Sequence, residues 1–186
     1  FEGRRPQARE LVVLAVMCAL AVAGRVAIPI PSFKAIFGII MIAGIAFGPE
    51  SGFLVGAISA LASNFFYSQG PYTPWQMMAY GAGGMLAGFV FARGRLPRKP
   101  VIMGIFGFLA VTFFVGPLLD TCSVFLVMSR ITLKGAMAFY ISGFPVNLRQ
   151  AVATAIVLLV LGKPLLEKLD RIKTKYGILD DGGKEA

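Results

Sequence analysis

Six apolar blocks, separated by short polar or proline-containing segments, follow one another along most of the chain. They cover residues 11–28, 35–48, 52–67, 74–92, 101–119 and 144–161. A helix needs about 20 mostly apolar residues to cross a bilayer, and only the second block is clearly short for that. The pattern therefore predicts an all-α membrane protein, a bundle of six transmembrane helices in a single domain over residues 1–176. The charged end, residues 177–186, is predicted to be a disordered cytoplasmic tail.

The segment between the fifth and sixth blocks, residues 120–143, departs from this pattern. It contains an apolar piece, residues 124–128, which is followed by Arg130 and Lys134. A structured loop on one face of the membrane and an extra short helix are both compatible with it, and we favour a loop with helical turns. Gly116 and Pro117 lie just before this segment, and the proline predicts a break in the fifth helix.

The composition supports a location in the membrane. Of the 186 residues 57% are hydrophobic and 15% are charged, whereas soluble domains carry about 25% charged residues. The net charge is +9, but the basic residues stand at the ends of the apolar blocks, which argues against nucleic-acid binding. Most of them precede the first block, separate the fourth from the fifth or follow the sixth. Because cytoplasmic loops carry the excess of Lys and Arg, both termini are predicted to be cytoplasmic.

Catalytic chemistry finds little support in the sequence. The chain has no histidine, which removes the commonest general base and the commonest metal ligand. It also lacks the GxxxxGK[ST] motif that holds nucleotide phosphates. Cys18 and Cys122 lie inside apolar blocks and are expected to be small buried side chains. We therefore expect no catalytic residue, no metal site, no cofactor and no ATP hydrolysis by this chain itself.

Polar residues gather towards the outer ends of the predicted helices. Such residues are costly inside a membrane and usually face a cavity or a partner. If the third to sixth helices bundle together, these residues converge near the outer surface, and aromatic walls with a few polar groups suit a small-molecule pocket. The candidate substrate-binding residues are Asn64, Tyr67, Tyr72, Trp75, Gln76, Tyr80, Asp120, Asn147, Arg149 and Gln150.

Alternative roles remain open for several of these residues. Tyr67, Tyr72 and Trp75 are equally compatible with the aromatic belt of a membrane interface. Arg149 could serve only to pair with Asp120. For Asp120, Asn147 and Arg149 we favour a role in the pocket, because charged and polar groups are costly that deep in a membrane and usually serve a function there.

The first predicted helix carries a stripe of small residues. Ala15, Ala19 and Ala23 are spaced by four and share one face, which would allow another helix to approach closely. The alternative is that alanine is simply common in apolar helices. Arg25, at the outer end of this helix, is expected to extend to the lipid headgroups. We expect this helix to be retained rather than removed as a signal peptide.

Several motifs add to this picture. They are the three alanines above and the segments 70–76 (GPYTPWQ), 116–120 (GPLLD), 143–151 (GFPVNLRQA) and 163–169 (KPLLEKL). With six predicted helices in under two hundred residues and no nucleotide site, the chain resembles the substrate-binding S component of an energy-coupling factor (ECF) vitamin transporter. The resemblance covers about residues 8–176. Among members of that family, the motifs are most similar to those assigned to cobalamin or its precursors.

The resemblance implies a function, partners and a location. An S component binds a vitamin or related micronutrient from outside, in a bacterial or archaeal cell membrane. It docks through its first helix, here through Ala15, Ala19 and Ala23, onto a transmembrane coupling protein that two cytoplasmic ATPases drive. The loop between the first two helices, residues 29–34, would gate the pocket, which makes Lys34 a further candidate. Related sequences often carry Asp near the position of Asn147, a departure that bears on the local binding chemistry.

Two other functions remain as alternatives. One is a stand-alone transporter or channel for a small solute, against which the absence of an internal repeat counts. The other is a membrane assembly subunit with no role in transport, which would bind no small molecule.

Overall fold

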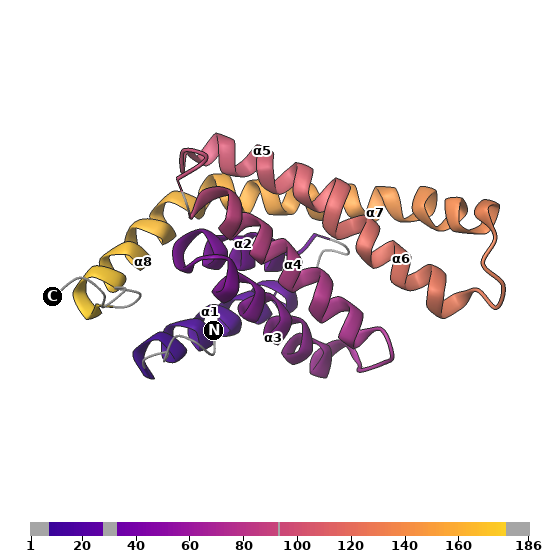
Figure 1. Cartoon of the computed structure of the whole chain (residues 1–186), viewed down its shortest axis with the longest axis horizontal. Helices are drawn as coiled ribbons and strands as arrows, with labels where there is room; N and C mark the ends of the chain where they lie inside the picture. Colours follow the sequence, from indigo (N-terminus) through magenta and orange to yellow (C-terminus); the bar gives the residue numbers. More distant parts are fainter. Residues whose placement is uncertain (1–7, 28–32, 93, 178–186) are drawn as a thin grey trace, which may run out of the picture.

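The computed structural model describes residues 8–27, 33–92 and 94–177, which form helices and no strand (Figure 1). In chain order the elements are α1 (Ala8–Val26), α2 (Ile36–Phe47), α3 (Pro49–Tyr67), α4 (Thr73–Phe91), α5 (Pro100–Ala110), the π-helical turn η1 (Val111–Val115), α6 (Gly116–Val127), α7 (Leu133–Val160) and α8 (Gly162–Tyr176). The all-α prediction is confirmed for these residues. The tail beyond residue 177 and most of the proposed gate, residues 29–34, lie outside the described residues.

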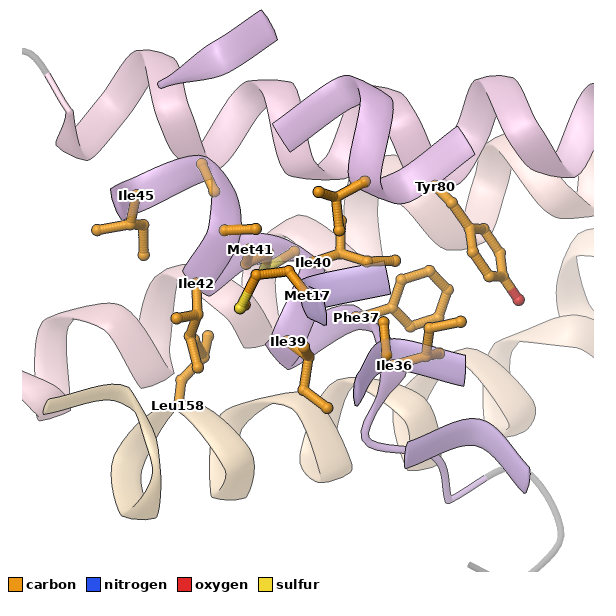
Figure 2. Packing of buried hydrophobic residues seen from close by; sticks show 14 of the residues in the cluster. Met17, Ile36, Phe37, Ile39, Ile40, Met41, Ile42, Ile45, Tyr80 and Leu158 are labelled. Atoms are coloured by element: carbon orange, nitrogen blue, oxygen red, sulfur yellow. The ribbon is translucent and has the colours of Figure 1, made fainter. Parts of the chain in front are cut away.

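The short helix α2 forms the centre of the molecule. All twelve of its residues are buried, because its sequence is apolar on every side and such a helix is stable only when neighbours surround it. It contacts α1, α3, α4, α7 and α8. Figure 2 shows Met17 of α1, Tyr80 of α4 and Leu158 of α7 around the side chains of α2. The second apolar block, which is short for a span, is thus the core helix of the bundle.

Glycines allow α3 and α4 to pack backbone against backbone. A Cβ atom added to Gly52 would lie 2.7 Å from the carbonyl carbon of Gly84 and 2.7 Å from the Cα atom of Gly44 on α2. Gly56 and Gly88 extend this seam, and a Cβ atom on either would meet backbone atoms of the opposite helix. Small residues spaced by four favour such close approach in membrane helices. This seam was not predicted, although Gly52 and Gly56 on α3 and Gly84 and Gly88 on α4 both show that spacing.

The fifth predicted helix does not break at Gly116-Pro117, as the sequence had suggested. The chain remains helical from Pro100 to Val127, because the turn η1 widens the helix just before the proline. The N–H of Gly116 donates to the carbonyl of Val111, five residues back. The π-turn interrupts the regular α-helical hydrogen-bond pattern directly before Pro117, which has no N–H and could not continue that pattern.

The preference for a loop over residues 120–143 is wrong. Helix α6 continues to Val127, and α7 begins at Leu133. The hydroxyl of Thr132 accepts a hydrogen bond from the N–H of Gly135 at 3.2 Å and so caps the start of α7. The apolar piece after Asp120 is the end of one helix and residues 133–143 are the start of the next, so the real connection is short. Figure 1 shows α6 and the first part of α7 side by side, extending beyond α1–α4.

Two helices among the described residues are long and apolar enough to cross a membrane by length and composition. They are Pro100–Val127 and Leu133–Val160, each of 28 residues, with mean hydropathy of 2.3 and 1.5 over their most apolar windows. The number of six crossings stays a prediction.

The end of α2 opposite the polar pockets described below is held by two basic side chains. Arg98 donates to the carbonyl of Ile45 and pairs with Asp170 of α8, both at 3.3 Å. Lys173 of α8 donates to the carbonyl of Ala46 at 2.7 Å. Cations at the C-terminal end of a helix satisfy its last carbonyls and offset its dipole. These contacts fix α8 and the loop between α4 and α5 beneath the core.

Candidate functional site

Two adjoining cavities lie between α1, α2, α3, α4, α6 and α7. The larger has a volume of about 460 Å³ and the smaller about 320 Å³. Five residues line both of them, namely Arg25, Tyr72, Gln76, Tyr80 and Gln150. The two cavities therefore form one continuous candidate site with two compartments.

The compartments differ in chemistry. The larger cavity adds Asp120, Ser123 and Asn147 to the shared residues, together with the apolar side chains Leu119, Cys122, Leu126, Val127 and Val146. The smaller cavity adds Lys34, Ile36, Phe37, Asn64 and Tyr67. Within the described part of the chain, a carboxylate lines only the larger cavity, whereas two cations line the smaller one. An aromatic ligand with polar groups at both ends would match this distribution.

Arg25 points into the protein and not to the lipid headgroups, so the snorkelling expected for it is wrong. Its Nη1 atom donates to Ser63 Oγ and, at 3.0 Å, to Asn64 Oδ1. The guanidinium lies 5.1 Å from the ring centre of Tyr67 and 5.6 Å from that of Tyr80. The packing of α1 on α3 brings Arg25 beside the polar last turns of α3, which offer it acceptors without leaving the bundle. Sequence reasoning missed this residue because its position at a helix end also fits an interfacial role.

Asn64 links this arginine to the start of α4. It is fully buried, and its Nδ2 atom donates to Gln76 Oε1 at 2.9 Å and to Thr73 Oγ1 at 3.2 Å. The amide of Asn64 therefore bonds at its oxygen to Arg25 and at its nitrogen to α4. This network fixes Gln76 and Arg25 on the wall that the two cavities share.

On the opposite wall, Asn147 of α7 donates to Asp120 Oδ2 of α6 at 2.7 Å. Asp120 was considered as a partner for Arg149, but the described structure pairs it with Asn147. A charged acceptor strengthens such a hydrogen bond, particularly away from water. Gln150, one turn further along α7, has a buried Oε1 atom without a hydrogen-bond partner in the described structure.

The structure brings most of the candidate residues together. Those that line the cavities are Lys34, Asn64, Tyr67, Tyr72, Gln76, Tyr80, Asp120, Asn147 and Gln150. Arg149 is exposed and lines neither cavity, because it lies about 200° around α7 from Asn147. Trp75 also lines neither of them; its Nε1 atom donates to the carbonyl of Leu118 at 2.6 Å, and its ring packs against Phe125. Trp75 thus joins α4 to α6.

The alanine stripe of α1 lies on the open side of the bundle. Ala15, Ala19 and Ala23 are all exposed, while the opposite face of the helix buries Leu14, Met17, Cys18 and Ala21. The three alanines therefore lie on the side of α1 that does not pack on α2 and α3, together with the exposed side chains of Val12, Val16 and Leu20.

The described residues contain no cluster of His, Cys, Asp or Glu that could hold a metal ion. Cys18 and Cys122 are both buried and unpaired.

Comparison with known proteins places these observations in a family. The family model described as the ECF-type riboflavin transporter, S component, matches residues 6–167. A search of curated proteins gives no match. The match confirms the resemblance to an ECF S component that the sequence motifs indicated, but it gives no support to cobalamin as the substrate. The chain belongs to the ECF-type riboflavin transporter S components, a family of membrane-embedded, substrate-binding subunits of ECF vitamin importers rather than of enzymes.

Proposed function

We propose that the two cavities together bind riboflavin or a close flavin analogue. The observation that carries this proposal is the set of nine predicted polar and aromatic residues around two adjoining cavities, with Arg25 as a tenth. Riboflavin combines a flat aromatic ring system with an imide edge and a chain of hydroxyl groups. Tyrosine rings, amides and two cations supply surfaces and hydrogen bonds for all three parts. The family description names the same vitamin.

The site also suits a ligand that enters from one side of the membrane. The cavities lie at the end of α1 that carries Arg25. At the other end of α1, the guanidinium of Arg9 lies 5.9 Å from the ring centre of Tyr176 on α8. The basic residues at the start of α1, before α5 and on α8 thus share the end opposite the cavities. Because basic loops remain cytoplasmic, we infer an outward-facing site and cytoplasmic termini.

Binding can be tested by titrating the purified protein with riboflavin and following the quenching of flavin fluorescence. We expect saturable binding with one site per chain and a submicromolar Kd. Asn147→Ala alters the cavity wall and should weaken binding, while Arg149→Ala, on the same helix but outside the cavities, serves as the matched control. Equal affinity in both variants and the native protein would argue against this location of the site.

Transport requires an energy source that this chain does not contain. We infer that α1 docks onto a transmembrane coupling protein through its exposed Ala15, Ala19 and Ala23, and that two ATPases drive that protein. Changing Ala15 and Ala19 to Leu should abolish co-purification with the coupling protein and uptake by cells, without weakening flavin binding. Val101→Leu, a similar change on the exposed face of α5, is the control. Uptake that survives the double change would refute docking through this face.

A further inference from the structure

A third cavity, of about 250 Å³, shares no lining residue with the candidate site. It lies between α1, α2 and the start of α8. Leu20 and Leu161 are 43% and 45% exposed, so the cavity opens onto the surface as a groove. Lys168 is the one polar side chain among the described residues that line it, which are Leu20, Ile39, Leu161, Pro164, Leu165 and Lys168.

The face of α8 that lines the groove continues beyond it as a row of cations. Positions three and four residues apart share one face of a helix. The face therefore starts apolar beside the groove, and its later turns carry three basic side chains, all of them exposed. We call this row the α8 stripe; it consists of Leu161, Pro164, Leu165, Lys168, Arg171, Ile172 and Lys175.

The acidic residues of α8 lie off the stripe. Glu167 is about 100° and Asp170 about 160° around the helix from Lys168. Each has a cation elsewhere, since Glu167 pairs with Lys163 at 3.9 Å and Asp170 pairs with Arg98 at 3.3 Å. Within the described part of the chain, Lys168 and Arg171 form no ion pair. The stripe is therefore a positive surface that the described protein leaves without counter-charge.

The surroundings of the groove indicate that lipid and not water fills it. The chain belongs to a membrane-embedded family, and the helix surfaces on both sides of the groove expose large apolar side chains. Water covers such surfaces poorly, whereas acyl chains cover them well. These side chains are Val12, Val16 and Leu20 on α1 and Leu159, Val160 and Leu161 at the end of α7.

The order of chemistry along the stripe matches one phospholipid molecule. The apolar part adjoins the end of the apolar helix α7, and the cations follow it along α8. Long basic side chains can extend their charges to the level of the headgroups, and basic pockets between membrane helices are known to bind anionic headgroups. An acyl chain followed by a phosphate presents the complementary order.

We propose that the groove binds an anionic phospholipid, with an acyl chain along Leu20, Leu161 and Leu165 and its phosphate at Lys168 and Arg171. The proposal is independent of the flavin site, because the two sites share no residue. A coupling protein that docks on α1 is the competing occupant of the groove.

Native mass spectrometry of the delipidated full chain, titrated with phosphatidylglycerol or with zwitterionic phosphatidylcholine, tests the proposal. We expect the native protein to retain one phosphatidylglycerol, with at least about tenfold preference. At the usual contribution of a surface cation, Lys168→Gln should weaken its binding about fivefold, and the double change with Arg171→Gln about 30-fold. Lys163→Gln is the matched control, because it lies on the same helix about 140° away from Lys168.

Leu20→Trp tests the apolar part of the groove without changing any charge. The larger side chain should occupy the groove and weaken retention of phosphatidylglycerol at least about tenfold, whereas Leu11→Trp, also exposed on α1, should not. Thermal unfolding without lipid checks that each variant folds, and added phosphatidylglycerol should raise the Tm of the native protein more than that of the double variant.

Three results would overturn the proposal. Equal retention of the two lipids, or of neither, by the native protein would leave the groove to the coupling protein. Equal losses in Lys163→Gln and Lys168→Gln would reduce the effect to net charge. Native retention in Leu20→Trp would place the lipid outside the groove.

Discussion

Asn147 of α7 donates a hydrogen bond of 2.7 Å to Asp120 of α6, and this pair forms one wall of the larger cavity. It joins two segments that lie 27 positions apart and are the two helices that extend furthest from the core (Figure 1). The pair therefore links the geometry of the pocket to the stability of the α6–α7 hairpin.

Removing the amide of Asn147 should affect both properties. In Asn147→Ala, the Asp120 carboxylate loses its donor and the cavity loses a polar wall. We expect flavin affinity to fall at least about tenfold and the free energy of unfolding to fall by about 1–3 kcal/mol, as for other hydrogen bonds to charged groups. Fluorescence titration and thermal unfolding in detergent would measure these two effects. Unchanged binding together with lowered stability would make the pair structural only.

Arg25 should require its guanidinium and not only its charge. Arg25→Lys keeps the charge, but a lysine ammonium cannot reproduce the planar fork that faces Ser63, Asn64 and the tyrosine rings. We therefore expect Arg25→Lys to weaken flavin binding by about tenfold, roughly 1.4 kcal/mol, and Arg25→Leu to weaken it further. Native affinity in the lysine variant would mean that Arg25 contributes only a positive charge.

The glycine seam between α3 and α4 should tolerate no added methyl group. Gly84→Ala places a Cβ atom 2.8 Å from the carbonyl carbon of Gly52, and backbone atoms cannot move aside as a flexible side chain can. We expect a loss of about 1–3 kcal/mol in stability, the usual cost of overpacking. Gly162→Ala is the control, because its Cβ atom would meet only the flexible end of Met103, at 3.0 Å. A similar melting temperature for the two variants would contradict a tight seam.

Lys173 should stabilise the end of α2 through its bond to the carbonyl of Ala46. We expect Lys173→Met to lower the free energy of unfolding by about 1 kcal/mol, as for other cations at a helix C-terminus. Lys168→Met, an exposed position on the same helix, should have a smaller effect. Thermal unfolding at low and high salt would compare them, and equal losses would show that Lys173 acts only through the net charge of α8.

The helices were predicted best where a continuous run of apolar residues is enough to define them. The apolar blocks fall within α1 to α7, apart from residues at some of their ends, because membrane and core helices both need continuous apolar residues. The same rule does not tell a core helix from a span, and the place of α2 among the six predicted crossings stays a prediction. The path of residues 120–143 was missed because Arg130 was given more weight than the apolar residues on either side, and the π-turn before Pro117 leaves no simple sequence signal.

The candidate site was predicted from the cost of polar groups among apolar helices, and the structure places Asn64, Asp120 and Asn147 on the cavity walls, where their binding role stays a prediction. Arg149 lies outside the cavities, because a polar residue near a helix end can also point outward, and only the rotation of α7 decides between the two directions. Arg25 shows the opposite error, since its long side chain reaches inward to acceptors on α3. Helix rotation is set by tertiary packing, which one sequence read by itself does not reveal.

A binding isotherm of riboflavin with the purified protein is the decisive test of the flavin site. We expect saturable, one-to-one quenching of flavin fluorescence with a submicromolar Kd, weakened in Asn147→Ala and unchanged in Arg149→Ala. Absence of saturable binding by the folded native protein, or binding that Asn147→Ala leaves intact, would contradict it.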